Sequence, residues 1–416
     1  MLRSDARSRL ALVCAVVSFA GCSSSSTSSS AQSTSTGSAA KTIKIGIDMP
    51  VSGGEAAVGI PTRNGAVLAI EQANAKGVPG GYTFAAYDLD DAVQGAHDPA
   101  QGAQNVKSFV ADDAVLGMVG PFNSSVAQAQ IPITNDAGLV QISPATTNPS
   151  LTQEPGAAKL RTSHPETNAF FRVCTTDDRQ GAAGASYARK LGLKKAFIVD
   201  DNETYGKGLA DVFEARFTAA GGTVLGHEHL TKGQNDYKAL LTKAHALAPD
   251  LIFYGGTTVT GGALLRKQMA DTGLGAIAFL GGDGIRDTEF LSSTAKAADG
   301  VAYTVAAPET SKLPTAAAFV AAYQKRWNAP VGPYSANAYT ATSIEIAAIE
   351  KAMAANGGNV PTRAAVLADV AATKGFASPI GAIGFDKNGD TTAPILSVYR
   401  IAGGKPVFVE QITLKD

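Results

Sequence analysis

The chain has 416 residues, of which 45% are apolar and 17% are charged, and its formal net charge at pH 7 is -1. This composition is ordinary for a folded soluble protein, and the nearly neutral charge argues against nucleic acid or another polyanion as the partner. Two of its 3 cysteines, Cys14 and Cys22, lie near the N-terminus. Because Cys174 is left alone, we expect no disulfide framework and interpret Cys174 as a small buried apolar residue.

The N-terminal segment has the pattern of a secretory signal. Three arginines precede an apolar stretch at residues 10–20, which is too short to span a membrane. The small residues just before Cys22 resemble the lipobox of bacterial lipoproteins, although Phe19 stands where leucine is usual. The resemblance implies that residues 1–21 are a lipoprotein signal peptide and that Cys22 is the lipidation site.

A flexible tether is predicted to follow. Residues 22–40 are almost entirely Ser, Thr, Gly, Ala and Gln, and are too poor in apolar groups to fold. No later apolar run reaches membrane-spanning length, so we expect the lipid alone to anchor the protein. The predicted location is extracytoplasmic, in the periplasm or on the outer face of the cell membrane.

From residue 43 to about residue 356, short β-rich runs alternate with helical segments, which is typical of βαβ units and a parallel sheet. The predicted strands are residues 43–47, 83–87, 115–119, 139–142, 196–200, 251–254, 277–280 and 301–304. Two early helices have clear boundary signals: one at 63–76, ended by Gly77, and one at 99–110, with Asp98 as its cap.

The C-terminal part changes character. Two long helices are predicted at residues 314–327 and 334–354, and two strands at 395–401 and 406–412 are predicted to form a hairpin across two glycines. Residues 41–416 exceed what one hydrophobic core usually supports, so we expect two lobes.

Loops that leave the carboxyl ends of the predicted strands are where a binding crevice should lie. The loop at 120–125 leads directly into a helix, whose first turn and Ser124 offer donors that suit a carboxylate, although an ordinary helix cap is an equally simple interpretation. Further loops of this kind follow other strands, at residues 143–149, 200–208, 255–258 and 280–284. The last of these loops places Asp283 among glycines.

In their residues and in their order along the chain, these loops resemble those of the substrate-binding proteins of branched-chain amino acid ABC importers, the leucine/isoleucine/valine-binding type. The most specific matching segments are residues 142–149, 205–208, 254–256 and 380–386. The resemblance covers nearly all of residues 41–416. It implies the α/β type I periplasmic binding protein fold, with two Rossmann-like lobes of parallel sheets joined by a three-crossing hinge.

The resemblance also implies where the lobes begin and end. The crossings are expected near residues 172–176, 305–308 and 380–385. The N-terminal lobe would comprise residues 41–173 plus 306–381, and the C-terminal lobe residues 174–305 plus 382–416.

The resemblance implies a binding site for both charged groups of an amino acid. Ser124 and Thr147 would hold the carboxylate. The carbonyl of Ala145 and the carboxylate of Asp283 would hold the ammonium group, and Tyr205 would close over the ligand. Such paired groups are needed because burying either charge alone costs several kcal/mol.

Two positions depart from the family pattern. Val58 and Thr257 stand where relatives place aromatic residues, and both are expected to help shape the side-chain pocket. Asp283 is one methylene shorter than the usual glutamate. We therefore expect room for a side chain larger or more polar than that of leucine.

The predicted function is capture of an amino acid, branched-chain or related, and its delivery to ABC permease and ATPase subunits by a monomeric lipoprotein. No cofactor, no metal and no covalent chemistry are expected. Alternatives of the same fold remain open: a small amide, a urea-like compound or another organic acid as cargo, or a ligand-sensing role.

An enzyme is the alternative from another class. The histidines are scattered, and no Gly-x-Ser-x-Gly motif accompanies them. If they lie on a strand, His227 and His229 share one face of it and could bind zinc, but the sequence nearby shows no third zinc ligand. The segment at 386–390 is similar to half of a calcium loop and is interpreted as a turn.

Overall fold

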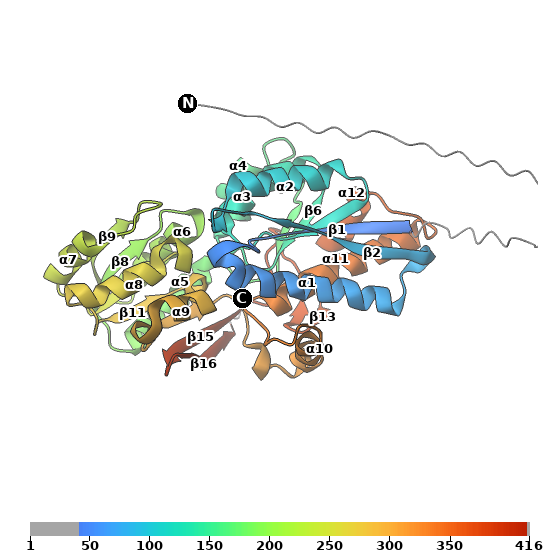
Figure 1. Cartoon of the computed structure of the whole chain (residues 1–416). Helices are drawn as coiled ribbons and strands as arrows, with labels where there is room; N and C mark the ends of the chain where they lie inside the picture. The colour runs from blue at the N-terminus through green and yellow to red at the C-terminus, as the bar shows by residue number, and fades with distance from the viewer. Residues whose placement is uncertain (1–40, 414–416) are drawn as a thin grey trace, which may run out of the picture. The chain divides into compact units, whose positions relative to one another are not determined.

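The computed structural model describes residues 41–413, whose two large β-sheets are each surrounded by helices (Figure 1). The signal peptide, the tether and the lipidation site at Cys22 that the sequence predicts lie outside the described residues. We refer to each large sheet with its helices as a lobe.

The first sheet has the strand order β2-β1-β5-β6-β7, and all its neighbouring strands are parallel. Its strands are β1 (Lys41–Met49), β2 (Tyr82–Asp90), β5 (Val115–Val119), β6 (Val140–Ser143) and β7 (Phe170–Arg172). The helices around it are α1 (Ala56–Lys76), α2 (Pro99–Ala111), α3 (Ser124–Asp136), α4 (Gly156–Leu160), α10 (Ala317–Trp327), α11 (Ser335–Ala355) and α12 (Arg363–Ala371). β5 is buried along its whole length, as expected for a parallel strand covered on both faces.

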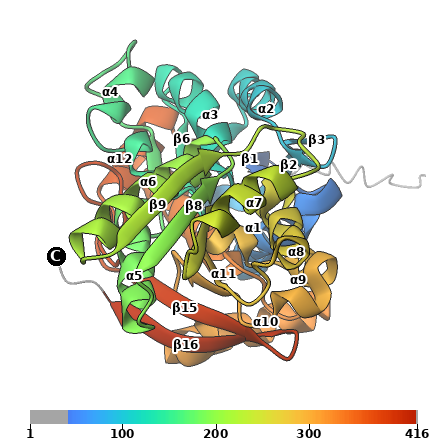
Figure 2. The same ribbon diagram turned by 90° about the vertical axis from the view of Figure 1, so that its left-hand side faces the viewer.

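The second sheet has the order β16-β15-β12-β11-β10-β8-β9 and is parallel except for its C-terminal hairpin. Its strands are β8 (Lys195–Asp200), β9 (Thr223–His229), β10 (Leu251–Gly255), β11 (Ala278–Gly281), β12 (Ala302–Val305), β15 (Ile395–Ala402) and β16 (Lys405–Thr413). Its helices are α5 (Asp177–Lys190), α6 (Thr204–Ala219), α7 (Lys238–Ala246), α8 (Ala263–Met269) and α9 (Thr288–Thr294). Figure 2 turns this lobe toward the viewer, with β8, β9 and the β15-β16 hairpin in front.

Each lobe has its own apolar core. In the first lobe, residues such as Ile45, Ile142 and Ile349 are fully buried between the sheet and α11. In the second, Phe253 and Leu280 are buried between the sheet and its helices. The two α/β lobes, each with its own core, confirm the predicted fold class.

The chain passes between the two sheets three times, at residues 173–176, 306–316 and 384–394. The third passage lies further along the chain than expected. Ile383 and Phe385, which the sequence assigns to the C-terminal lobe, pack in the first core. The exact boundaries of the lobes otherwise stay a prediction.

Helix boundaries follow the local signals in most places. The side chain of Asp98 accepts hydrogen bonds from the backbone N–H groups of Ala100 and Gln101, both at 2.9 Å, so the predicted cap of α2 is confirmed. α1 ends at Lys76, with Gly77 at φ 88° as its C-cap. The predicted start of α1 at residue 63 is wrong, because Pro61 lies inside the helix instead of before it.

Among the strands of the two large sheets, β7 and β9 were not predicted, whereas the C-terminal hairpin is confirmed. Cys174 is 1% exposed, and its thiol donates a hydrogen bond to the carbonyl of Thr146 at 3.3 Å. Burial raises the pKa of this thiol far above its usual value, which agrees with a structural role.

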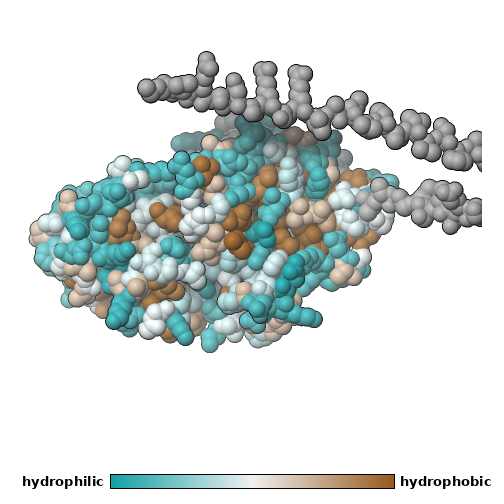
Figure 3. Space-filling view, in the orientation of Figure 1, coloured by the Kyte–Doolittle hydropathy of each residue, from teal (hydrophilic) through white to brown (hydrophobic). Residues whose placement is uncertain are grey.

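The described residues contain no helix that combines the length and the apolar character needed to cross a bilayer. On the face seen in Figure 3, hydrophobic residues are scattered among hydrophilic ones.

Candidate functional site

A cavity lies between the two lobes, at the carboxyl ends of the parallel strands, where open α/β sheets bind ligands. It has about 300 Å³ of empty space, including the part open to solvent. Its lining residues come from five strand-to-helix connections and from the segment before α11: Phe122, Asn123, Ser124, Ala145, Tyr205, Thr257, Asp283, Gly284 and Tyr334. Five of the seven predicted ligand-binding residues are among them.

The first lobe contributes the start of α3. No side chain caps this helix, and the side-chain oxygen of Asn123 is buried without a hydrogen-bond partner among the described residues. The Ser124 hydroxyl is also buried and, within residues 41–413, accepts only a long hydrogen bond, at 3.3 Å, from the backbone N–H of Asn148. Free N–H groups and the positive end of the helix dipole at this wall suit an anion.

The second lobe contributes a carboxylate. Asp283 begins a short helical turn, Asp283–Ile285, directly after β11. The Tyr205 hydroxyl donates to it at 2.6 Å, and the Tyr334 hydroxyl donates to its other oxygen. Burial, together with the charge of Asp283, raises the pKa of both tyrosines well above their usual range, so both remain neutral donors. Asp283 is thus a negative group held in place by two rings.

Thr147 is buried but does not line the cavity. Its hydroxyl donates to the side chain of Asp177 at 2.9 Å, and its carbonyl accepts from the Asp177 backbone N–H at 2.9 Å. Burial, and then the charge of Asp283, raises the pKa of Asp177 well above its usual value. A role for Thr147 in binding stays a prediction.

The loop that carries Thr147 is held by a buried arginine. Arg172 is fully buried, and it donates to the carbonyls of Thr146 at 3.0 Å and Asn148 at 2.8 Å. Its Nε lies 2.6 Å from Asp390, in the third segment that joins the lobes. Burial would raise the pKa of Asp390, but the charge of Arg172 and its hydrogen bond lower it. The ion pair therefore connects the loop at residues 146–148 to the third segment between the lobes.

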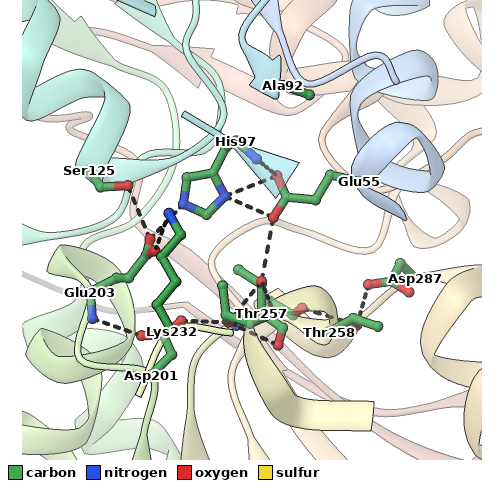
Figure 4. Close-up of polar contacts among 12 residues, drawn as sticks. Glu55, Ala92, His97, Ser125, Asp201, Glu203, Lys232, Thr257, Thr258 and Asp287 are labelled. Carbon is green, nitrogen blue, oxygen red and sulfur yellow. Dashed lines mark hydrogen bonds and ion pairs between the residues drawn. The ribbon is translucent and has the colours of Figure 1, made fainter. Parts of the chain in front are cut away.

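Behind Thr257 the lobes are bridged by a polar cluster, the Glu55–His97–Glu203 bridge (Figure 4). The Thr257 hydroxyl lies 3.4 Å from Glu55. His97 Nδ1 lies 2.9 Å from Glu55, in the same lobe, and Nε2 lies 2.6 Å from Glu203, in the other lobe. The Ser125 hydroxyl donates to Glu203 at 3.3 Å.

His97 is 3% exposed. Burial by itself would lower the pKa of its imidazole, but the charge of Glu55 and the hydrogen bonds to Glu203 and Glu55 raise it well above its usual value. Only the protonated ring donates from both nitrogens at once. The bridge is therefore a buried cation between two carboxylates, one from each lobe.

Val58 lies on α1, is 8% exposed and is not among the residues that line the cavity. Sequence reasoning missed Phe122, Asn123 and Tyr334. Tyr334 follows Gly332 and Pro333 and has a left-handed backbone with φ 59°, a combination that marks a constrained turn before the long helix α11.

A sequence model of the periplasmic binding protein family matches residues 42–405. The Leu/Ile/Val-binding protein BraC3 of Rhizobium johnstonii is 33% identical over 369 residues, which is 88% of this chain and 94% of that protein.

Solved structures are similar as well. The branched-chain amino acid transporter substrate-binding protein LivJ of Streptococcus pneumoniae, in complex with isoleucine, matches with a TM-score of 0.77 and 25% identity over 90% of this chain and 100% of that chain. A solute-binding protein of an ABC transporter from R. palustris, in complex with benzoate, has a TM-score of 0.74 at 22% identity, over 90% of this chain and 98% of that chain, and shows the fold alone. The chain belongs to the periplasmic binding protein family and has the type I fold.

Proposed function

We propose that this protein is the extracytoplasmic solute-binding component of an ABC importer and that it holds an amino acid between its lobes. The observation that carries the proposal is the charge arrangement of the cavity: the uncapped start of α3 with Ser124 on one lobe, and the carboxylate of Asp283 on the other. A ligand with both a carboxylate and an ammonium group satisfies both walls. A ligand with one charge leaves the other wall unpaired.

In this proposal, Ser124 and the first N–H groups of α3 bind the carboxylate. The Ala145 carbonyl and Asp283 bind the ammonium group, and Tyr205 covers the ligand while its hydroxyl orients Asp283. Thr147 takes part only if its hydroxyl turns away from Asp177. The protein carries out no covalent step on the ligand and needs no cofactor for binding.

The side-chain pocket combines rings and polar groups. Phe122 and Tyr334, whose rings meet edge to face at 5.6 Å, line the cavity, and Thr257 lies between the cavity and Glu55. The proposed ligand is a branched-chain amino acid, as the names of the relatives suggest, or one whose larger or more polar side chain reaches Thr257. A role for Val58 in shaping this pocket stays a prediction.

An aromatic acid is the second candidate, because the R. palustris relative holds benzoate. Such a ligand would pair with α3 but would place its uncharged ring beside the carboxylate of Asp283. That buried carboxylate would be left without a cationic partner, so this candidate is the weaker one. We also propose that the protein acts as a monomer, is anchored by a lipid on Cys22 and delivers its ligand to permease and ATPase subunits.

A thermal-shift screen of the purified protein against the common L-amino acids, small amides and benzoate tests the proposal. The expected result is stabilisation by one or a few L-amino acids, followed by one-to-one binding in isothermal titration calorimetry. Stabilisation by benzoate or an amide, with none by any amino acid, would contradict it.

A further inference from the structure

A second cluster of polar side chains lies at the edge of the second sheet, apart from the cavity. β8 and β9 pair in parallel, with Ile198 opposite His227 and Asp200 opposite His229. Since side chains alternate along a strand, His227 and His229 point to the same side of β9. Asp200 ends the neighbouring strand on that side and lies between the two rings.

The distances within the cluster are short. His227 Nε2 lies 2.7 Å from Asp200 Oδ2, and His229 Nδ1 lies 2.8 Å from the same oxygen. The three ligand atoms lie within 4.8 Å of one another. The side chain of Asp200 is fully buried, that of His227 is 14% exposed, and that of His229 is 44% exposed, so the cluster is open to solvent on one side.

The surroundings hold the ligand groups in place. The Nδ1 atom of His227, which faces away from Asp200, lies 2.6 Å from the carboxylate of Glu214 on α6. The backbone N–H of Asn202 donates to Asp200 Oδ1 at 2.7 Å. A carboxylate behind a histidine fixes the tautomer that presents the other nitrogen to a metal ion. Lys207, also on α6, is paired with Asp211 at 2.6 Å.

We propose that Asp200, His227 and His229 bind one divalent transition-metal ion, with Zn²⁺ as the first candidate. Two imidazole nitrogens and one carboxylate oxygen form a ligand set that Zn²⁺ accepts, and water completes a tetrahedral site. Asp200 and Glu214 together carry two negative charges, which balance the ion. Binding requires the three ligand atoms, which are now at hydrogen-bond distance, to move apart by a fraction of an ångström.

The sequence did not reveal this site because its third ligand is distant along the chain. Asp200 precedes His227 by 27 positions, and only the pairing of β8 with β9 brings them together. The proposal does not depend on the ligand of the cavity. The bound ion is expected to connect β8 with β9 directly, and with α6 through Glu214, and so to stabilise the edge of the second lobe.

Isothermal titration calorimetry of chelator-treated, metal-free protein with Zn²⁺ tests the proposal. We expect one ion per chain, and loss of this binding in both His227→Gln and His229→Gln. The second variant changes a half-exposed side chain and should fold normally. Glu214→Gln, which alters only the outer carboxylate, should weaken binding about 10- to 100-fold.

His164→Gln is the matched control. His164 is exposed and also lies near two carboxylates, Asp136 at 3.6 Å and Glu166 at 3.7 Å, and its replacement should leave zinc binding unchanged. Titration with Co²⁺ should produce the visible absorption bands of a tetrahedral complex in the wild type but not in His229→Gln. Absence of one-to-one Zn²⁺ binding, or binding unchanged in both histidine variants, would overturn the proposal.

Discussion

Replacing His97 with glutamine tests whether the Glu55–His97–Glu203 bridge holds the lobes together over the ligand. Glutamine keeps one hydrogen-bond donor but carries no charge. The two carboxylates would then face each other across the lobe boundary without the buried cation that now lies 2.9 Å from one and 2.6 Å from the other. We call the form in which the lobes meet around the ligand the closed form, and the form in which they are apart the open form. We expect the variant to lower the stability of the closed form relative to the open form.

The size of the effect follows from burial. Removing one partner of a buried, hydrogen-bonded charge pair costs about 2–5 kcal/mol. Glu203 keeps 19% of its side chain exposed, and the Lys232 ammonium lies 3.8 Å from it, so part of its charge stays compensated. We therefore expect the variant to weaken the free energy of ligand binding by about 2 kcal/mol, the lower end of the range, which corresponds to about a 30-fold loss of ligand affinity.

The effect should depend on pH. The pKa of His97 is raised in the closed form, so protonation stabilises that form. This contribution is complete below the pKa of an exposed imidazole, about 6.5, and is lost as the pH rises through the raised value. Asp201 also titrates, since burial raises its pKa to about 7, and because the charge of His97 lowers that pKa, its loss in the variant should raise the Asp201 pKa further. The affinity difference between the two proteins should therefore shrink at alkaline pH.

The assay is isothermal titration calorimetry with the amino acid that stabilises the protein most in the screen. Glu203→Gln removes the charged partner of His97 in the other lobe, together with the weak pair with the exposed Lys232, and leaves the Glu55–His97 pair intact, so it should weaken binding with little change in melting temperature. His164→Gln, at an exposed site, is the control. Wild-type affinity in both His97→Gln and Glu203→Gln would refute the reasoning.

Three further predictions concern buried ionisable residues. Asp283→Asn should weaken amino acid binding by about 2–5 kcal/mol in calorimetry, because the carboxylate proposed to face the ammonium group is lost. Arg172→Met should lower the free energy of unfolding in urea by about 3–5 kcal/mol, because Asp390 loses its buried partner. Glu345→Met should raise the free energy of unfolding at neutral pH by about 1–3 kcal/mol, because this fully buried carboxyl has no hydrogen-bond partner among the described residues. Burial raises the Glu345 pKa well above its usual value, so the wild type loses stability as the pH rises above that usual value, and the gain should shrink in acid.

Each of these predictions has a result that would contradict it. Unchanged affinity in Asp283→Asn removes that residue from the site. Unchanged stability in Arg172→Met means that the pair with Asp390 contributes nothing net. A destabilised Glu345→Met at neutral pH means that its carboxyl has a partner that offsets its burial.

The sequence predicts well where local chemistry decides the structure. β5 matches its predicted bounds because its run of four apolar residues and one glycine is bounded by turn residues. The cap of α2 follows from Asp98 and Pro99 alone. β9 was missed because it is a half-exposed edge strand with polar residues such as His227, Glu228 and His229, and so lacks an apolar run.

The parts of the site that were not predicted depend on contacts between distant residues. His97 and Glu203 are 106 positions apart and meet only when the two lobes meet. The hydroxyl of Thr147 pairs with the buried Asp177, which is 30 positions further along the chain and begins α5 of the second lobe. Arg172, the last residue of the short strand β7, is fully buried. Because it is charged, a pattern of apolar residues does not predict this core position.

The most direct test of the central claim compares three ligands by calorimetry: the best-binding amino acid, the carboxylic acid that lacks its ammonium group, and the amine that lacks its carboxylate. If the cavity pairs both charges, each analogue should bind about 2–5 kcal/mol more weakly than the amino acid. Binding of the carboxylic acid, or of benzoate, as tightly as the amino acid would contradict the claim.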